Sequence, residues 1–338
     1  MMKNGLILEG GAMRGMFTCG VLDVLMENGI VFDGAAGISA GAVFGCNYKS
    51  RQIGRAVRYN MAYCKDPRYC SVRSLLRTGD LFGVEFCYHE LPNVLDPFDR
   101  DAFQKNRMEF YIGATDVRTG KAVFHLCSDG GDKDIEWMRA SASMPMVSRI
   151  VKIDGYELLD GGIADPVPYA LMEKKGYRHN VLVLTQPAGY RKKKASFLPM
   201  IRLRLNEYPQ LVKAMENRHL QYNRQMEEIE VKERSGSAIV IRPPEALGIG
   251  HTEHDARELE RVYQIGRKEG FRRLEEIKNF IEKCHNSNAL LNLNECRKII
   301  DLIRVLKTFG EVDNYISLFM KFQILIFLSS LQEIIFPE

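Results

Sequence analysis

The chain has 338 residues, of which 46% are hydrophobic and 27% charged, and its formal net charge at pH 7 is +4. The length allows one large domain or two smaller ones, and the apolar fraction is ordinary for a globular protein. This small charge, without any arginine-rich or aromatic-interleaved module, gives no reason to expect a nucleic-acid partner.

The first predicted element is a short buried strand, Leu6-Ile7-Leu8-Glu9, rather than a secretion signal, because charge follows so soon after the N-terminus. A glycine-rich loop, Gly10-Gly11-Ala12-Met13-Arg14-Gly15, joins it to an apolar helix over residues 16–26. Such a loop exposes backbone N–H groups that suit a nucleotide phosphate or the oxyanion of an acyl-transfer intermediate. The spacing disfavours a nucleotide, since Ala12 replaces the middle glycine of G-x-G-x-x-G. We therefore expect the Gly11 and Ala12 amides to be oxyanion donors, with a plain packing turn as the alternative.

The second informative element is the pentapeptide Gly37-Ile38-Ser39-Ala40-Gly41, between an apolar stretch at 32–37 and a predicted helix over 42–46. A strand, a sharp turn and a helix are the context in which G-x-S-x-G presents a serine nucleophile. The glycines allow a tight backbone, and the start of a helix stabilises negative charge near the hydroxyl. Alone, the pentapeptide is equally compatible with an ordinary helix start.

In the middle of the chain we expect a buried strand over 110–115, and a strand over 121–125 that pairs with residues 150–159 at a sheet edge. Asp160 ends the apolar run Leu158-Leu159 and is followed by Gly161 and Gly162. A serine needs a base to take its proton, and burial raises the pKa of a carboxylate toward the working pH. Asp-Gly is also a common turn signal.

Further strands are predicted over 180–185 and 237–242, with an amphipathic helix over 213–232 between them and another over 253–284. This alternation predicts a sheet with helices on both faces. The segment 191–204 interleaves basic and apolar residues, which fits either a solvated loop leading into a helix or a contact with an anionic membrane.

We expect residues 1–284 to form one catalytic domain and residues 285–338 a helical, apolar C-terminal extension. Within the extension, the apolar run 316–331 is shorter than the ~20 residues of a spanning helix and contains Lys321. It is interpreted as a helix docked on the catalytic domain or in an oligomer interface, with a membrane-surface helix as the alternative.

Together, the glycine-rich loop, the Ser39 pentapeptide and Asp160-Gly161-Gly162, in that order, resemble bacterial members of the patatin-like phospholipase family. The stretch 140–145, rich in Ala and Ser, is similar to the family's segment ahead of the Asp, and the motifs span residues 5–170. The resemblance implies a three-layer α/β/α sandwich with a central, mostly parallel sheet.

The resemblance also implies roles for individual residues. Ser39 would be the nucleophile and Asp160 its partner in a dyad. The oxyanion loop would include Gly10, Gly11, Ala12 and Arg14, with Ala12 where a third glycine often stands; an alanine still offers its amide. The remaining motif glycines are Gly15, Gly37, Gly41, Gly161 and Gly162.

Histidine is not expected in the site, because a lone histidine in a helical or polar stretch usually lies on the surface or in a satisfied core position. The function that follows is a serine lipid acyl hydrolase, which cleaves ester bonds of phospholipids or lysophospholipids through an acyl-enzyme, without metal or cofactor. A carboxylesterase or thioesterase for soluble substrates and a non-catalytic lipid-binding protein are the alternatives. The scattered cysteines indicate free thiols and a cytoplasmic protein. Peripheral contact at the inner membrane surface is an expectation that rests on the basic and apolar segment 191–204.

Overall fold

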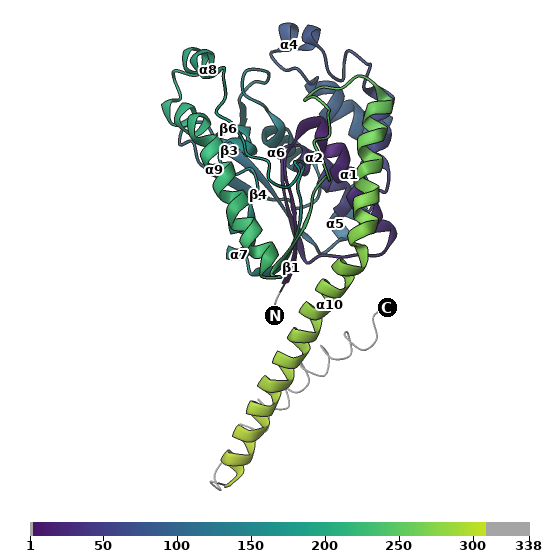
Figure 1. Cartoon of the computed structure of the whole chain (residues 1–338), viewed down its shortest axis with the longest axis vertical. Coiled ribbons are helices and arrows are strands. Elements are labelled where there is room, and N and C mark those ends of the chain that lie inside the picture. The colour runs from purple at the N-terminus through teal and green to yellow at the C-terminus, as the bar shows by residue number, and fades with distance from the viewer. Residues whose placement is uncertain (1–2, 309–338) are drawn as a thin grey trace. The chain divides into compact units, whose positions relative to one another are not determined.

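Strands and helices are interspersed along the chain up to Ile241, as expected of a sheet covered by helices (Figure 1). The computed structural model describes residues 3–308, with side chains placed for residues 3–283. The strands are β1 (Lys3–Leu8), β2 (Gly34–Ile38), β3 (Glu109–Asp116), β4 (Ala122–Leu126), β5 (Val151–Ile153), β6 (Tyr156–Asp160), β7 (Tyr177–Val183) and β8 (Ala238–Ile241). The longer helices are α1 (Gly15–Glu27), α2 (Ala40–Lys49), α3 (Arg55–Tyr63), α6 (Asp132–Ala142), α9 (Pro209–Arg234) and α10 (Ala256–Thr308).

The remaining helical segments connect these elements. They are η1 (Ala12–Arg14), α4 (Val72–Thr78), η2 (Phe86–Leu95), α5 (Arg100–Lys105), η3 (Gly161–Ile163), α7 (Tyr169–Lys174) and α8 (Leu198–Arg204). The segment from α3 to α5 follows α2 and precedes β3, and the sequence pattern gave no prediction for it.

In the described part of the chain the strands form one eight-stranded sheet in the order β5-β6-β3-β2-β1-β7-β8, with β4 paired to β3. The five central and C-terminal strands β3, β2, β1, β7 and β8 run parallel, whereas β4, β5 and β6 are antiparallel additions. The expectation that 121–125 pairs with 150–159 is wrong. Tyr111 to Thr115 of β3 pair with β4, and β5 instead forms a hairpin with β6.

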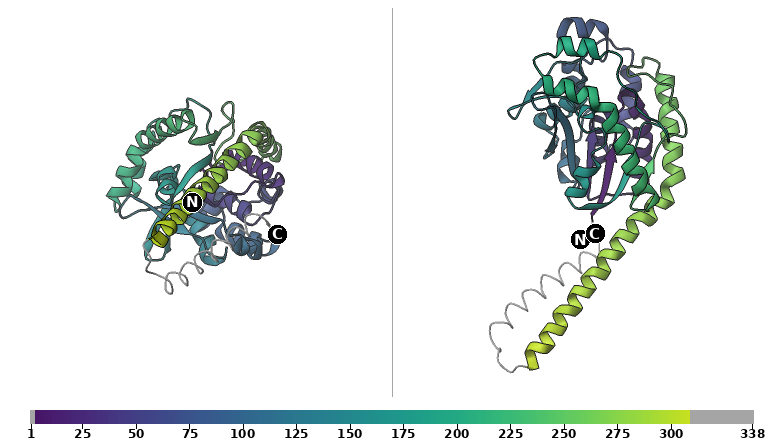
Figure 2. Two further views of the ribbon diagram at one scale, coloured as in Figure 1. Left: turned by 90° about the horizontal axis from the view of Figure 1, so that it is seen from below. Right: turned by 60° about the vertical axis from the view of Figure 1, so that its left-hand side comes forward.

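Side chains of alternate residues in each strand enter two different cores, because successive side chains of a strand point to opposite faces. On one face, Leu6 and Leu8 of β1 pack in a core that includes residues of α1, α2, α6 and α10. On the other face, Ile7 packs with Tyr222 and Met226 of α9. Figures 1 and 2 show these helices on the two sides of the sheet, which confirms the predicted three-layer arrangement.

The register along β3 brings the ends of β2 and β6 together. Strand β2 pairs in parallel with residues 109–113 of β3, and its last residue, Ile38, lies opposite Gly113. Strand β6 runs the other way, and its last residue, Asp160, lies opposite Ala114. Because β4 occupies the other edge of β3 over residues 111–115, β2 and β6 share one edge and meet end to end. Ser39, which follows Ile38, and Asp160, which precedes Gly161, are therefore neighbours.

The chain divides into two compact units, residues 1–284 and residues 285–338. The helix predicted over 253–284 begins at Ala256 and continues as α10 to Thr308. The apolar run 316–331 lies outside the described residues, and the division into a catalytic domain and an extension stays a prediction. Between residues 3 and 308, no helix combines the length and the apolar character needed to cross a bilayer.

Candidate active site

Ser39 occupies the sharp turn between β2 and α2. Its backbone has φ 54° and ψ −121°, a conformation that side-chain-bearing residues rarely adopt and that stores strain. The turn is held by Ser141 of α6, whose hydroxyl accepts a hydrogen bond from the Ser39 N–H at 2.8 Å and donates to the Gly113 carbonyl at 2.6 Å. The Ser39 side chain thus stands at the N-terminus of α2 on a turn fixed from the neighbouring helix and strand.

Asp160 faces Ser39 across the junction of β2 and β6. The Ser39 hydroxyl donates to Oδ2 of Asp160 at 2.6 Å, and the Gly162 N–H donates to Oδ1 at 2.8 Å. The backbone of Asp160 is also fixed, because its N–H donates to the Ser143 carbonyl and its carbonyl accepts from the Thr115 hydroxyl. Burial raises the pKa of the Asp160 carboxyl, and the nearby Arg218 guanidinium and the hydrogen bond from Ser39 oppose that rise. A buried carboxylate with a raised pKa is a better proton acceptor for a hydroxyl than an exposed one.

The glycine-rich loop lies directly against the Ser39 turn. A β-carbon built on Gly10 would lie 2.8 Å from the β-carbon of Ser39, so only glycine allows this approach. Ala12 has a φ of 48°, and within residues 3–308 the N–H groups of Gly11 and Ala12 donate to no acceptor. Unpaired amides next to a serine hydroxyl are the arrangement expected of oxyanion donors.

The other predicted motif residues occupy the same junction. Gly15 begins α1, Gly37 belongs to β2, and Gly161 and Gly162 begin η3 directly after Asp160. Gly41 lies in α2, where a β-carbon would come within 2.4 Å of the Leu8 carbonyl oxygen and push the helix off β1. The structure therefore brings Gly10, Ser39, Asp160 and Gly162 into direct contact or hydrogen bonding, and Arg14 lies in η1, which begins at Ala12 directly after Gly11.

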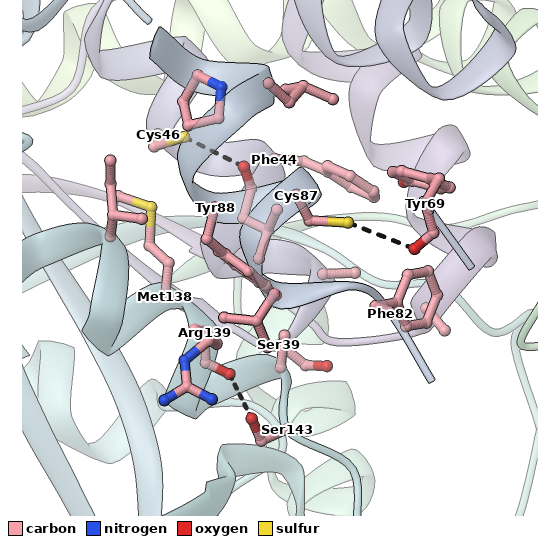
Figure 3. Close-up of a pocket in the computed structure, with 18 of the residues that line it drawn as sticks. Ser39, Phe44, Cys46, Tyr69, Phe82, Cys87, Tyr88, Met138, Arg139 and Ser143 are labelled. Carbon is pink, nitrogen blue, oxygen red and sulfur yellow. Dashed lines mark hydrogen bonds between the residues drawn. The ribbon is translucent and has the colours of Figure 1, made fainter. Parts of the chain in front are cut away.

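An apolar pocket of about 120 Å³ opens beside Ser39 (Figure 3). Its walls come mainly from α2 and α6 and from the segment 55–98, in which no element was predicted. Most of its lining side chains are aromatic, aliphatic or sulfur-containing, including Phe44, Tyr69, Tyr88 and Met138. Such a lining suits a hydrocarbon chain whose reacting end lies at Ser39.

Two cationic residues near Asp160 were not predicted as part of the site. Arg218 of α9 donates through Nε to the Gly162 carbonyl at 2.6 Å. Lys192 follows β7, and burial together with Arg218 lowers the pKa of its ammonium group to about 8. The sequence offered only a weak signal for either residue, since Lys192 belongs to a basic run and Arg218 to a helix with many charges. No histidine within residues 3–283 hydrogen-bonds to Ser39 or Asp160.

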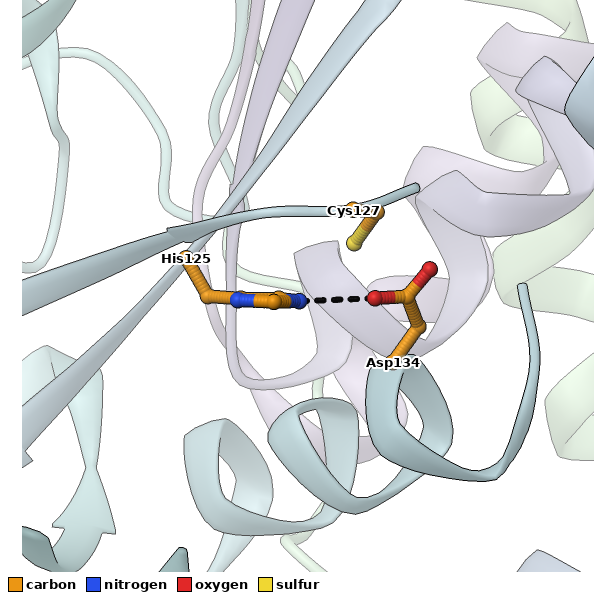
Figure 4. Close-up of side chains that lie close together, drawn as sticks. All are labelled: His125, Cys127 and Asp134. Carbon is orange, nitrogen blue, oxygen red and sulfur yellow. Dashed lines mark hydrogen bonds and ion pairs between the residues drawn. The ribbon is translucent and has the colours of Figure 1, made fainter. Parts of the chain in front are cut away.

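A second cluster, formed by His125, Cys127 and Asp134, has the side-chain types of a metal site (Figure 4). The Asp134 carboxylate already accepts from His125 Nε2 at 2.7 Å and from the N–H groups of residues 128, 129 and 130. The ammonium group of Lys49 interacts electrostatically with both Cys127 and Asp134. Because the carboxylate is fully hydrogen-bonded and a cation is near, the cluster fits a brace at the start of α6 better than a metal site.

Two family models match the chain. A model described as patatin-like phospholipase matches residues 6–172, which include Ser39, Asp160 and the glycine-rich loop. A second model, described as a domain of unknown function (DUF6363), matches residues 208–282, which include α9 and much of α10. The first match covers the pocket and both residues of the Ser39–Asp160 pair.

Several curated proteins are similar to this chain. An uncharacterized protein YjjU of Escherichia coli is 31% identical over 196 residues, which are 55% of this chain and 53% of that protein. Lysophospholipase NTE1 of Coccidioides immitis is 26% identical over 294 residues, which are 81% of this chain and 18% of that protein. An uncharacterized NTE family protein of Mycobacterium tuberculosis is 30% identical over 172 residues, covering 50% of this chain and 45% of that protein. The matched parts thus span about half of the bacterial relatives and less than a fifth of the fungal one.

Proposed function

Because this chain belongs to the patatin-like phospholipase family through residues 6–172, we propose that it is a serine lipid acyl hydrolase that acts on phospholipids or lysophospholipids. The observation that carries the proposal is the 2.6 Å hydrogen bond from the Ser39 hydroxyl to the buried Asp160 carboxylate, at the mouth of an apolar pocket. Relatives named lysophospholipase support the choice of a lipid ester as substrate.

In the proposed first half-reaction, Asp160 accepts the hydroxyl proton of Ser39 while Oγ attacks the ester carbonyl. The N–H groups of Gly11 and Ala12 then stabilise the tetrahedral oxyanion, and loss of one such donor typically costs about 10²–10³ in rate. When the carbon–oxygen bond to the alcohol breaks, the proton held by Asp160 passes to the leaving oxygen. The acyl chain remains bound to Ser39 as an ester.

In the second half-reaction, Asp160 takes a proton from water as the water oxygen attacks the acyl-enzyme. Collapse of the second tetrahedral intermediate releases the fatty acid and returns the proton to Ser39 Oγ. Asp160 serves twice as base and twice as acid, which suits a carboxyl whose pKa is raised by burial. The chain's own residues account for each proton in this scheme.

The test is hydrolysis by the purified full chain of a long-chain lysophospholipid and of a short-chain nitrophenyl ester. We expect Ser39→Ala and Asp160→Asn to lower the rate on both by about 10⁴-fold or more, while Ser50→Ala keeps the normal rate. A fluorophosphonate probe should label the unmodified chain and leave Ser39→Ala unlabelled. Near-normal activity of Asp160→Asn would contradict the dyad.

The second candidate, a carboxylesterase or thioesterase for soluble substrates, uses the same dyad. The lining of the pocket by aromatic and aliphatic side chains favours a long acyl chain over a short one. A preference for short-chain esters with no gain of rate on vesicles would favour this candidate over the phospholipase. A purely lipid-binding protein would not need the hydrogen bond between Ser39 and Asp160.

A further inference from the structure

The cation of Arg218 lies beside the dyad on the side away from the apolar pocket. Both groups lie close to Gly162. A β-carbon built on Gly162 would be 3.2 Å from an Nη nitrogen of Arg218 and 3.0 Å from Oδ1 of Asp160. The guanidinium is therefore close to the carboxylate, yet it hydrogen-bonds to the Gly162 carbonyl rather than to Asp160. Its remaining N–H groups have no acceptor within the part of the chain whose side chains are placed.

Lys192 lies next to Arg218 because its segment is fixed to the same helix. The Lys192 N–H donates to the Asn223 side chain at 2.8 Å, and the Lys192 carbonyl accepts from it at 3.1 Å. The ammonium nitrogen lies 4.7 Å from the ring centre of Tyr222, which follows Arg218 by one helical turn. Burial and the charge of Arg218 both lower the pKa of Lys192, as expected for two cations that lie close together.

Neither cation has a carboxylate partner among residues 3–283. The two nearby acids are already hydrogen-bonded, since Glu9 accepts from the N–H and hydroxyl of Thr185, and Asp160 accepts from Ser39 and Gly162. The Nε group of Arg14, on the glycine-rich loop, is also buried without an acceptor. Half-buried cations that have no carboxylate partner are costly unless a ligand supplies the opposite charge.

We propose that Arg218 and Lys192 form an anion subsite that receives the phosphate group of the substrate, while the acyl chain occupies the pocket on the other side of Ser39. Arg218 belongs to α9, which packs on the opposite face of the sheet from α2, so the two subsites lie on different sides of Ser39. A guanidinium and an ammonium group are the side chains that bind phosphate most strongly. The proposal rests on the proposed function and narrows its substrates to phosphate-bearing lipids.

Residues 208–282, which the family model DUF6363 matches, contribute to this proposed subsite. Three side chains of α9 hold the loop after Asp160: Arg218 contacts Gly162, Gln221 contacts the Ala164 carbonyl, and Gln225 donates to Asp165 at 2.6 Å. Residues 208–282 therefore position the loop that follows Asp160, and they supply Arg218, one of the two proposed phosphate ligands.

The test compares two substrates with the same acyl chain, a lysophosphatidylcholine and a monoacylglycerol. For Lys192→Met we expect kcat/KM on the lysophospholipid to fall by about ten- to a hundredfold, mainly through KM, as expected for loss of a charged hydrogen bond. On the monoacylglycerol the change should be smaller than about threefold. Lys213→Met, which changes an exposed lysine of α9, is the matched control and should leave both rates unchanged.

Equal losses on both substrates for Lys192→Met would overturn the subsite. Direct binding separates this failure from a failure of the proposed function. Calorimetric titration of the full chain with glycerophosphocholine and with inorganic phosphate needs no turnover, and binding of either that is weakened by Lys192→Met supports the subsite. Binding of glycerophosphocholine alone identifies a lipid headgroup as the source of the phosphate, binding of both identifies a general phosphate site, and binding of neither overturns the proposal.

A separate surface at the same end of the molecule exposes apolar side chains. In α4, Leu76 and Val72 are 84% and 67% exposed, and in α8 Leu203 is 78% exposed. Both helices lie at the end of the sheet toward which β1 runs, in both views that show this end (Figures 1 and 2). Neither helix contains an acidic residue, whereas each contains two arginines.

From this surface we infer that α4 and α8 dock the protein on an anionic bilayer. Apolar side chains that enter the headgroup region, flanked by arginines that meet anionic lipid, are the chemistry of peripheral membrane binding. The docking surface is defined by Val72 and Leu76 of α4 and by Met200, Leu203 and Arg204 of α8, all exposed. It would present the end of the sheet that carries Ser39 to the bilayer.

Vesicle co-sedimentation tests this docking surface. The full chain should bind vesicles with 30% phosphatidylglycerol, and the double variant Leu76→Ser with Leu203→Ser should bind them at least about fivefold more weakly. Val231→Ser removes an equally isolated exposed side chain near the far end of α9 and should not change binding. Unchanged binding of the double variant would overturn the inference, as would equal binding to vesicles without anionic lipid.

Discussion

The backbone N–H of Ser39 donates to the hydroxyl of Ser141 at 2.8 Å, although 102 residues separate the two in the sequence. Through this bond α6 holds a turn whose φ of 54° is unfavourable for serine. Ser141 touches neither the ester carbon nor the base and acts as a positioning residue.

Ser141→Ala leaves the buried amide of Ser39 without an acceptor. We expect the free energy of unfolding to fall by about 1–3 kcal/mol and kcat to fall by about tenfold or more, because Oγ of Ser39 is no longer held toward Asp160. Denaturant unfolding and steady-state kinetics on a lysophospholipid measure the two effects. Ser50→Ala, which also removes a buried hydroxyl, should leave kcat unchanged. Normal kcat in Ser141→Ala would show that the turn at Ser39 keeps its conformation without this hydrogen bond.

Backbone strain at Ser39 can be measured by comparing two inactive variants. Glycine adopts a positive φ without penalty, whereas alanine keeps the β-carbon that causes the strain. We expect Ser39→Gly to be more stable than Ser39→Ala by about 1 kcal/mol, although glycine usually lowers stability elsewhere. Chemical denaturation of both variants is the measurement. A less stable glycine variant would mean that the turn is not strained.

The raised pKa of Asp160 predicts how activity depends on pH. Asp160 accepts the proton of Ser39 only when it is ionised, and burial raises its pKa above the ordinary value of about 3.9. The acid limb of kcat/KM on a neutral monoacylglycerol should therefore lie at a higher pH than that of an exposed aspartate. An acid limb at or below the ordinary value would contradict a buried base.

The same pKa shift predicts the stability of Asp160→Asn. A carboxyl whose pKa is higher in the folded chain contributes most to stability below its unfolded pKa, and this contribution is lost as pH rises through the folded pKa. At pH 7.5 the ionised group is a net cost, so Asp160→Asn should melt a few degrees higher than the unmodified chain. The difference should shrink toward pH 4. Thermal unfolding of both proteins at the two pH values measures the difference in melting temperature, and a lower melting temperature of Asp160→Asn at pH 7.5 would contradict the prediction.

The His125–Cys127–Asp134 cluster is predicted to be a hydrogen-bonded brace. Asp134→Ala leaves three backbone N–H groups and His125 without their acceptor, and we expect a loss of about 3 kcal/mol. Asp132→Ala, two residues away with its carboxylate 83% exposed, is the control and should cost less than about 0.5 kcal/mol. Treatment with a chelator should leave the melting temperature unchanged. A fall in melting temperature with the chelator would identify a metal site instead.

Much of this arrangement follows from short-range sequence signals. The strand before Gly10, the turn at Ser39 and the position of Asp160 at a strand end were all predicted, because each depends on local backbone chemistry. The pairing of residues 121–125 was not, since a strand pattern does not say which neighbour it joins. Residues 150–159 form their own hairpin, and its turn at Asp154-Gly155 has positive φ at both positions, a signal that was present in the sequence.

The parts of the site that were missed depend on long-range packing. Arg218 is one of many charged residues on α9, and only the contact with Gly162 distinguishes it from the others. The pocket walls between α3 and η2 come from a segment for which no element was predicted, and their place next to Ser39 depends on tertiary packing that local patterns do not reveal. The match of the patatin-like model covers this segment without assigning its wall residues.

The meeting of β2 and β6 on one edge of β3 has a consequence for how substrate preference can change. Pairing with Gly113 and Ala114 of β3 places the nucleophile opposite the base, and none of the residues that hold the two in place lies in the segment 51–105. Residues 51–105 leave after α2 and return before β3, so insertions or deletions there reshape the cavity without altering the register. Acyl-chain length can therefore diversify among homologues, or be engineered, by exchanging this segment while the chemistry stays constant.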